Sequence, residues 1–501
     1  MAEKVVFIGG GLGGLVCGCL LANEGYEVEI LEKHSIIGGG LHCFTHKGVN
    51  FETGIHYIGG FREHDVLFKI FNYLGIARNL AIQPLDTNGF DVMHVGSDGR
   101  KYRMGVGREN YTQILIEEFP EQAENIRNYV AAMYSIADDI PLFNLRIVND
   151  NVWYFDERFL VSVGEFIKSY ITDYKLQQVL AWSNTLYAGE ENTTPAYIHT
   201  LVTKFCIEGA SRFVGGTQQL ANAMTSYIED RGGRVITNTK AARIEVENKR
   251  IEKILSADNR SFTGDYYISA IHPAMLLDMI DPEKIQHAYR NRLQNLENTY
   301  SAVTVFVIFK PGSFPFMNHN YYYFDDYETV WNSVECPDEL FPPGFMMLTP
   351  TCPNQGEFAE KAIINCVIKH DRFEKWSNTH IGKRGSDYYE LKARYQKKIL
   401  DKVDQVFPGF NQCVQHAFSS TPLTLRDYLG SKNGSLYGYK KDCRNIVQTQ
   451  ILPRTKLENL LLTGQNINLH GIIGVPLSAI VTAGTLVGYE KLLNKINEAN
   501  N

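Results

Sequence analysis

The sequence has few of the features that mark nucleic-acid-binding, metal-binding or hydrolytic proteins. Its 501 residues carry a net charge of −7 and contain no long run of basic residues, so no nucleic-acid partner is expected. The nine cysteines are scattered, with no C-x-x-C pair and no Cys/His spacing typical of metal sites. This predicts no metal, and reduced thiols in a cytoplasmic protein. Neither a Ser-His-Asp arrangement nor an H-E-x-x-H motif supports a hydrolase.

The sequence also lacks a long uninterrupted apolar segment that would span a membrane. The best candidate, residues 471–484, contains Pro476 and several glycines and is too short. With 44% hydrophobic and 21% charged residues, the composition is typical of a soluble globular protein, and the length predicts two or three domains. The 28 Tyr and 27 Phe residues suit a wide apolar cavity, although a large core with exposed tyrosines would have the same composition.

What the sequence does contain is a glycine-rich turn close to its start. Gly9, Gly11 and Gly14 have the G-x-G-x-x-G spacing, and they lie between an apolar run at 5–8 and a second one at 15–22. The first glycine permits a tight turn, the second lets a pyrophosphate approach the backbone, and the third lets the helix pack on the strand. The N-terminus of that helix would offer free N–H groups to the phosphates. This pattern predicts a dinucleotide site.

A carboxylate follows at the distance that such a site requires. The predicted strand 28–31 ends at Glu32, about 20 residues after the turn, where a carboxylate can bind both ribose hydroxyls. The alternative is a signal peptide running from Lys4 to Ala22, but six glycines and the lack of a cleavage site argue against it. We find one such turn, whereas a flavoprotein with a separate NAD(P)H domain should have two. FAD is therefore favoured as the sole nucleotide held in a fold of its own.

The rest of the chain predicts an interrupted α/β fold. We expect a discontinuous Rossmann-like FAD-binding domain, of the two-dinucleotide-binding-domain flavoprotein type, with an inserted α+β substrate domain. Apolar runs predict strands of a mixed or antiparallel sheet, which would form the floor of a substrate cavity, at 302–309, 321–324, 345–348 and 362–367. The predicted domains are 1–62, 206–297 and 445–501 for FAD binding, and 63–205 and 298–444 for substrate binding.

Several stretches resemble one family of flavoproteins. These stretches are 38–40, 51–57, 215–216 and 463–465, together with the more specific 54–59 and 382–388. They are similar to the retinol saturase and carotenoid desaturase-isomerase (phytoene desaturase-like) family, over most of the chain but weakly between 63 and 180. The resemblance implies FAD as cofactor, a long apolar polyene or isoprenoid lipid as substrate, and NAD(P)H as a candidate external electron donor.

The resemblance also implies which residues hold the cofactor. Residues 9–14 and Glu32 would hold the adenosine half and its diphosphate, Ala241 would meet the adenine, and Gly464 would lie by the ribityl chain and flavin. Asn466 stands where many relatives have Asp or Glu, so a charged contact is missing there. The complete predicted set is Gly9, Gly11, Gly13, Gly14, Glu32, Lys33, Gly39, Gly40, Ala241, Gly464, Asn466, Gly474 and Val475.

The implied reaction is hydride transfer between a flavin and a C=C bond, which also needs a proton donor and exclusion of water. The candidate catalytic residues are His56, Tyr57 and His470, with packing roles as the alternative. Tyr187 would either line the cavity or pack, and Arg212 would either neutralise the flavin or cap a loop.

The direction of the reaction stays open at this point. Retinol saturase-like reduction is the first hypothesis. There are three alternatives: a desaturase that passes electrons to oxygen or a quinone, a redox-neutral polyene isomerase, and a flavin-containing lipid carrier without turnover.

Because an apolar substrate enters from a bilayer or a carrier, we expect peripheral membrane contact near 140–165, where Leu142, Phe143, Trp153, Tyr154 and Phe155 cluster. The alternative there is an ordinary core helix and loop. The oligomeric state is not predicted.

Overall fold

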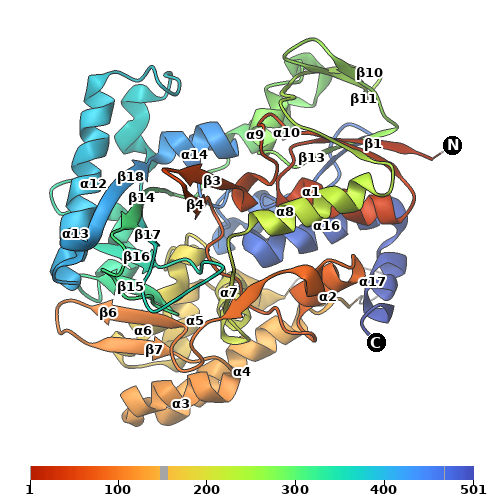
Figure 1. Cartoon of the computed structure of the whole chain (residues 1–501). Coiled ribbons are helices and arrows are strands. Elements are labelled where there is room, and N and C mark those ends of the chain that lie inside the picture. Colours follow the sequence, from red (N-terminus) through yellow and green to blue (C-terminus); the bar gives the residue numbers. More distant parts are fainter. Residues whose placement is uncertain (1, 147–155, 468) are drawn as a thin grey trace.

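The computed structural model describes residues 2–146, 156–467 and 469–501, and it is built around two sheets (Figure 1). The first is a five-stranded parallel sheet with the order β19-β13-β1-β2-β9. It brings together the two ends of the chain and a central segment. Its strands are β1 (Lys4–Ile8), β2 (Glu27–Leu31), β9 (Arg234–Ile236), β13 (Tyr266–Ser269) and β19 (Leu460–Leu462).

The parallel sheet is buried, as its continuous apolar sequences require. Val5, Val6 and Phe7 of β1 are completely buried between β2 and β13. Helices α1 (Leu12–Asn23), α8 (Gln218–Glu229) and α16 (Gly471–Val487) lie side by side along this sheet (Figure 1). Cys17 and Cys19 are buried within α1, so they are packing residues, and burial raises the pKa of both thiols.

The second sheet has seven strands in the order β18-β14-β17-β16-β15-β6-β7, all antiparallel to their neighbours except the pair β15 and β6. The four strands predicted between 302 and 367 are all present in it. Its strands are β6 (Asp91–Val95), β7 (Lys101–Met104), β14 (Ser301–Phe309), β15 (Asn320–Phe324), β16 (Gly344–Leu348), β17 (Lys361–Ile368) and β18 (Val414–Ser420).

The two faces of this sheet pack differently, because side chains alternate along each strand. In β14, Val303, Val305 and Val307 pack in one cluster with residues of the long helix α12 (Ser386–Val406). Phe306 packs on the opposite face, in a cluster with the helical segment before residue 207. That segment contains α3 (Arg108–Glu118), α4 (Ala123–Asp139), α5 (Val163–Tyr170), α6 (Tyr174–Leu180) and α7 (Ala196–Ile207).

Strands β6 and β7 were not predicted, since residues 63–205 read as mainly helical. They extend the edge of a sheet whose other strands follow more than 190 residues later, so the second sheet draws on two separate stretches of chain. The exact domain boundaries stay a prediction. A smaller antiparallel sheet completes the nucleotide side, with β10 (Ala241–Glu247), β11 (Arg250–Ser256) and β12 (Ser261–Phe262).

Two observations bear on the expected membrane contact. Within the described ranges, no helix combines the length and the apolar character needed to cross a bilayer. Leu142 and Phe143 are buried in the core beside the parallel sheet, so they do not contribute an exposed apolar mouth. Trp153, Tyr154 and Phe155 lie outside the described residues.

Candidate active site

The glycine turn between β1 and α1 has the tight geometry that its spacing predicts. Gly9 has a φ of 101°, in the region that favours glycine. A Cβ atom on Gly14 would lie 2.1 Å from the carbonyl oxygen of Gly9, so helix and turn are in direct backbone contact there. No side chain of the described residues caps the N-terminus of α1, where Gly11 is the N-cap. The first amides of α1 are therefore available to an anion.

Glu32 lies at the end of β2, directly beside this turn. One carboxylate oxygen accepts a hydrogen bond from the Gly10 amide at 2.9 Å, and the other accepts from the His34 amide at 2.9 Å. The carboxylate is thus fixed by two backbone donors while the residue stays 6% exposed. Ala241, at the start of β10, lies two residues beyond Thr239, whose amide donates to the Glu32 carbonyl at 2.7 Å.

The second glycine group closes over the first. The Gly38 amide donates to the Gly10 carbonyl at 2.9 Å, and a Cβ atom on Gly39 would lie 3.1 Å from the Cα atom of Gly11. The Gly40 carbonyl accepts from the Gly54 amide at 3.2 Å. Because Gly54 lines the cavity described below, the glycine loop connects the nucleotide turn to that cavity.

The two glycine groups, 9–14 and 38–40, form a glycine cradle, and the C-terminal segment packs against its other side at Gly464. A Cβ atom on Gly13 would lie 2.8 Å from the Cα atom of Gly464 and 3.4 Å from Cγ1 of Val475. Gly474 lies in the first turn of α16, packed against Leu469. Gly13 is therefore a neighbour in space of Gly464 and Val475, two predicted cofactor residues that follow it by more than about 450 positions in the sequence.

Asn466 is held within the protein. Its side-chain oxygen accepts from the Tyr439 amide at 3.0 Å, and its carbonyl accepts from Nζ of Lys441 at 3.2 Å. Burial lowers the pKa of Lys441 to about 8, so this lysine is a buried donor that stabilises the turn after Gly464. Sequence reasoning did not single out Lys441.

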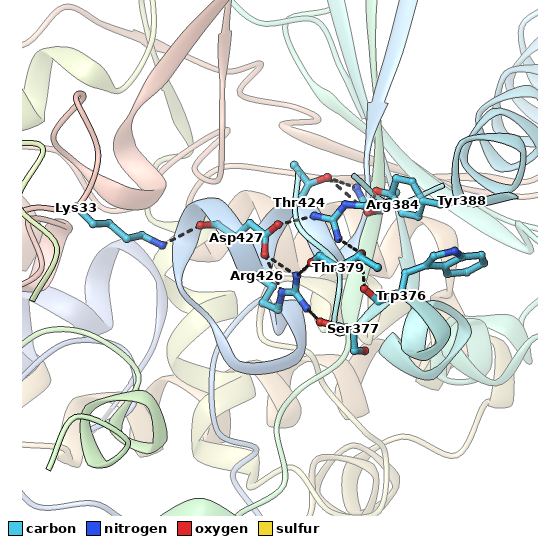
Figure 2. A network of polar contacts seen from close by, with 10 residues as sticks. Lys33, Trp376, Ser377, Thr379, Arg384, Tyr388, Thr424, Arg426 and Asp427 are labelled. Atoms are coloured by element: carbon cyan, nitrogen blue, oxygen red, sulfur yellow. Dashed lines mark hydrogen bonds and ion pairs between the residues drawn. The ribbon is translucent and has the colours of Figure 1, made fainter. Parts of the chain in front are cut away.

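The side chain of Lys33, one of the predicted cofactor residues, contacts a distant part of the chain. Its Nζ atom donates to the Asp427 carbonyl at 2.8 Å, near the end of α14 (Pro422–Leu429), as Figure 2 shows. Next to it, Nε2 of His34 contacts the Tyr428 carbonyl at 2.7 Å. Both residues after Glu32 therefore cap the C-terminal carbonyls of α14, and Lys33 supplies the positive charge that is favourable there.

The other side of α14 is anchored by two arginines (Figure 2). Arg384 and Arg426 both form ion pairs with the Asp427 carboxylate, and Arg426 also donates to the Thr379 carbonyl at 3.0 Å. The Arg384 side chain is only 3% exposed. Through Arg384, this network connects the stretch 382–388 to α14, while Lys33 connects α14 to the nucleotide side.

A cavity of about 220 Å³ lies between the second sheet and the N-terminus of α16. Its sheet side comes from β14, β15, β16 and β17, which confirms the prediction that this sheet forms the floor of a cavity. Opposite the sheet lie the segment 53–59 and residues 470–473, and Leu425 and Leu429 of α14 add a wall. Among the described residues that line the cavity, none is Asp, Glu, Lys or Arg.

All three predicted catalytic residues line this cavity. His56 has its Nδ1 atom 3.7 Å from the Glu52 carboxylate, too far for a hydrogen bond, and neither atom has a partner among the described residues. His470 is the N-cap of α16, and its ring lies against that of Tyr437 with 4.5 Å between centroids. Burial lowers the pKa of His470 to about 3, so its imidazole is neutral at physiological pH.

Tyr57 belongs to a buried polar network that sequence reasoning missed. Its hydroxyl donates to the Asp91 carboxylate at 3.1 Å and lies 3.0 Å from the Tyr322 hydroxyl. Asp91 is completely buried at the start of β6, and burial raises its pKa to about 6. Tyr57 and Tyr322 both line the cavity, so a carboxyl group lies one hydrogen bond behind its wall.

Tyr187 and Arg212 lie outside the cavity lining. The Tyr187 hydroxyl is 3.0 Å from Nδ1 of the buried His199. Arg212 is 1% exposed and donates to four acceptors at 2.7–3.0 Å. These acceptors are the carbonyls of Met317, His319 and Thr349 and the side-chain oxygen of Asn320. Arg212 is thus committed to holding a loop in place, and Tyr187 packs.

The comparison with known protein families agrees with this arrangement. A family model described as "flavin containing amine oxidoreductase" matches residues 12–484. The chain belongs to this family. As a flavin-containing oxidoreductase it is an enzyme that uses FAD, and its residues fit that cofactor: the glycine cradle, the uncapped N-terminus of α1 and the positioned carboxylate of Glu32 are the groups that a dinucleotide needs.

Curated relatives of this flavin-containing oxidoreductase span nearly its whole length. It is 25% identical to the all-trans-retinol 13,14-reductase of Rattus norvegicus, over 96% of this chain and 85% of that protein. It is 22% identical to a 4,4'-diaponeurosporene oxygenase of Staphylococcus aureus, with both chains fully covered. Among solved structures, putrescine oxidase bound to putrescine aligns with a TM-score of 0.66 at 14% identity, over 97% of this chain and 99% of that one, which shows the fold.

Proposed function

We propose that this flavin-containing oxidoreductase transfers a hydride between FAD and a C=C bond of a long apolar polyene or isoprenoid lipid, in the direction of reduction. One observation carries the proposal. The cavity beside the glycine cradle is apolar, and its described lining has no Asp, Glu, Lys or Arg side chain. It therefore suits an uncharged lipid better than a substrate with an ammonium or a carboxylate group. The names of the curated relatives, a retinol reductase and a carotenoid oxygenase, support this substrate class.

The predicted cofactor residues would hold FAD as follows. The amides at the start of α1 would bind the diphosphate, and Glu32 would accept hydrogen bonds from the ribose hydroxyls. Gly39, Gly40 and Gly464 would permit close approach of the rest of the cofactor, because no side chain extends from them. We infer that Lys33 acts on FAD only indirectly, since its ammonium is bound to α14.

When bound, FAD supplies a group that donates or accepts a hydride. The protein has to orient the double bond, keep water away and provide a proton. The aromatic and aliphatic lining of the cavity serves the first two tasks. Burial lowers the pKa of His470 and so disfavours its charged, acidic form, whereas the hydroxyls of Tyr57 and Tyr322 are proton donors at the cavity wall.

The proposal is tested by an anaerobic flavin titration. The purified protein is expected to show a bound flavin spectrum, and NADH, NADPH, all-trans-retinol or 4,4'-diaponeurosporene is then added. Bleaching by a reduced nicotinamide, followed by reoxidation on adding the polyene, supports a reductase with NAD(P)H as donor. Bleaching by the polyene alone identifies a desaturase instead, and isomerised polyene without net reduction identifies an isomerase.

Two results would refute an oxidoreductase role. A protein that retains lipid while its flavin responds to none of these compounds is a carrier. A folded protein that binds no flavin at all, with Glu32 and the glycines intact, would overturn the whole assignment. Cytoplasmic location and peripheral membrane contact stay predictions. Sedimentation with liposomes at low and high salt tests the membrane contact.

A further inference from the structure

The Asp91 carboxylate is held by partners of two kinds. Nε1 of Trp182 donates to one oxygen at 2.9 Å, and Nδ2 of Asn320 donates to the other at 2.7 Å. The indole can only donate. The Asn320 amide is fixed as a donor too, because its oxygen is already occupied by Arg212 at 2.9 Å. These two contacts cannot accept a proton from Asp91.

The third partner is a hydroxyl, which can either donate or accept. When Asp91 is ionised, Tyr57 donates to it, and Tyr322 must then donate to Tyr57. When Asp91 is protonated, its hydrogen has one accepting partner among the described residues, Tyr57. Tyr57 then donates to Tyr322, and the hydroxyl hydrogen of Tyr322 turns toward the cavity that both tyrosines line.

We propose that Asp91, Tyr57 and Tyr322 form a proton relay into the cavity, with Tyr322 as the donor to the substrate. This inference rests on the proposed function. In the step, the O–H bond of Tyr322 breaks and a C–H bond forms at one carbon of the double bond. Tyr57 reprotonates Tyr322, and Asp91 reprotonates Tyr57 and becomes a carboxylate. The other carbon receives a hydride, with its electron pair, from FAD that an external two-electron donor has reduced, so the alkene is reduced and the flavin is oxidised.

The surroundings of Asp91 suit a group that exchanges protons near neutral pH. Complete burial raises its pKa to about 6, while the hydrogen bonds from Trp182, Asn320 and Tyr57 and the charge of Arg212 oppose the rise. The Cys206 thiol also faces this group, and burial raises its pKa, so it is neutral. Among the described residues named as acting on Asp91, Arg212 is the one cation; its charge acts on Asp91 directly, and the Asn320 side chain hydrogen-bonds to both residues.

A first test needs no substrate and no turnover. Infrared difference spectra of the purified protein are recorded between pH 4 and 8. The wild type is expected to show the C=O band of a protonated carboxylic acid that is lost with a midpoint near pH 6, and Asp91→Asn should lack this band. In Tyr57→Phe the midpoint should rise, because the ionised form loses a hydrogen bond. A spectrum without such a band, or one that Asp91→Asn leaves unchanged, overturns the relay.

A second test measures proton delivery itself. The flavin is photoreduced anaerobically and mixed with all-trans-retinol, and its reoxidation is followed in a single turnover. Since a positioned acid contributes roughly 10²–10⁴-fold, Tyr322→Phe should slow reoxidation at least about 100-fold. The wild-type rate should fall as pH rises through about 6, and this inflection should be absent in Asp91→Asn and Tyr57→Phe.

Tyr102→Phe is the matched control. Tyr102 is also completely buried and also forms a Tyr–Tyr–Asp chain, with Tyr327 at 2.6 Å and Asp98 beyond it, but it does not line the cavity. Its variant should keep both the rate and the inflection. If the wild type reoxidises with retinol but Tyr322→Phe does so equally fast, the relay is refuted and the proposed function stands. If no polyene reoxidises the wild-type flavin, the proposed function fails, and the infrared test still decides whether Asp91 exchanges protons.

Discussion

The glycine turn offers the sharpest test of the cofactor site, through Gly14→Ala compared with Gly18→Ala. Both residues lie in α1, so each alanine gains about 1 kcal/mol of helix propensity over glycine. The two new methyl groups meet different neighbours. On Gly14 the Cβ atom would lie 2.1 Å from the backbone oxygen of Gly9, whereas on Gly18 it would lie 3.1 Å from the mobile ends of Ile30 and Ile228.

The magnitude follows from which of these neighbours can move. A contact of 2.1 Å with a main-chain oxygen can be relieved only by shifting α1 away from the turn, and overpacking of this kind costs about 1–3 kcal/mol or more. After subtracting the gain in helix propensity, we expect a net cost of about 2 kcal/mol. We expect this cost to appear in the free energy of FAD binding, because the shift displaces the phosphate-binding amides of α1. Because about 1.4 kcal/mol is a factor of ten in affinity, the Kd for FAD should rise by about 30-fold in Gly14→Ala.

The assay is titration of the deflavinated protein with FAD, followed by quenching of flavin fluorescence. Gly18→Ala should bind FAD within about threefold of the wild type, since two isoleucine methyl groups can give way. If Gly14→Ala binds FAD as tightly as Gly18→Ala while circular dichroism shows both folded, the nucleotide does not lie on this turn, and the reasoning from the glycine cradle is wrong.

Three further predictions concern buried charge. Burial raises the pKa of Asp91 from 3.8 to about 6, which favours the neutral form in the folded state. The resulting stabilisation is lost as pH rises through 6, so between pH 4 and 7 the wild type should lose about 2 kcal/mol of unfolding free energy relative to Asp91→Asn. Denaturation midpoints that stay parallel over this range would contradict the prediction. Asp427→Asn removes the ion-pair partner of Arg384, whose side chain is 3% exposed, and should lower the free energy of unfolding in urea by about 3 kcal/mol. As a control, Asp401→Asn breaks an exposed pair with Lys397 and should lower it by less than about 0.5 kcal/mol. The imidazole of His470 should show no titration between pH 5 and 8 by NMR, and a midpoint in that range would show that burial does not keep it neutral.

The parts of this protein that could be predicted from the sequence are those fixed by local pattern. The turn at Gly9–Gly14 follows from glycine spacing between two apolar runs, and β14 follows from the apolar run 302–309, which the structure extends by one residue to Ser301. Each of these segments has to take the conformation it does because of its own residues. Glu32 could be predicted in the same way, because its distance from the turn is set by the length of one helix and one strand.

The missed residues depend on pairing between distant segments. Asp91 is a single carboxylate in a short stretch without clear periodicity, and it becomes special only because β6 pairs with β15, which begins 229 positions later at Asn320. Tyr322 lies in a run of three tyrosines, and the sequence gives no sign of which one faces the cavity. The family resemblance placed Lys33 among the cofactor residues, and no pattern in the sequence indicates that its ammonium meets α14, nearly 400 residues further on.

The location of Asp91 also explains how an uncharged cavity can be combined with a reaction that needs a proton. A carboxylate placed in the cavity wall would have to be dehydrated by each lipid that binds, and an unpaired buried charge is costly. Placed behind Tyr57, the same carboxyl group keeps its three hydrogen-bond partners whether or not the cavity is filled, and in the proposed relay it meets the substrate only through neutral hydroxyls. The two tyrosines thus allow an apolar lipid to bind and a proton to be delivered in the same cavity. Removing either hydroxyl should slow protonation of the double bond while the lipid still binds.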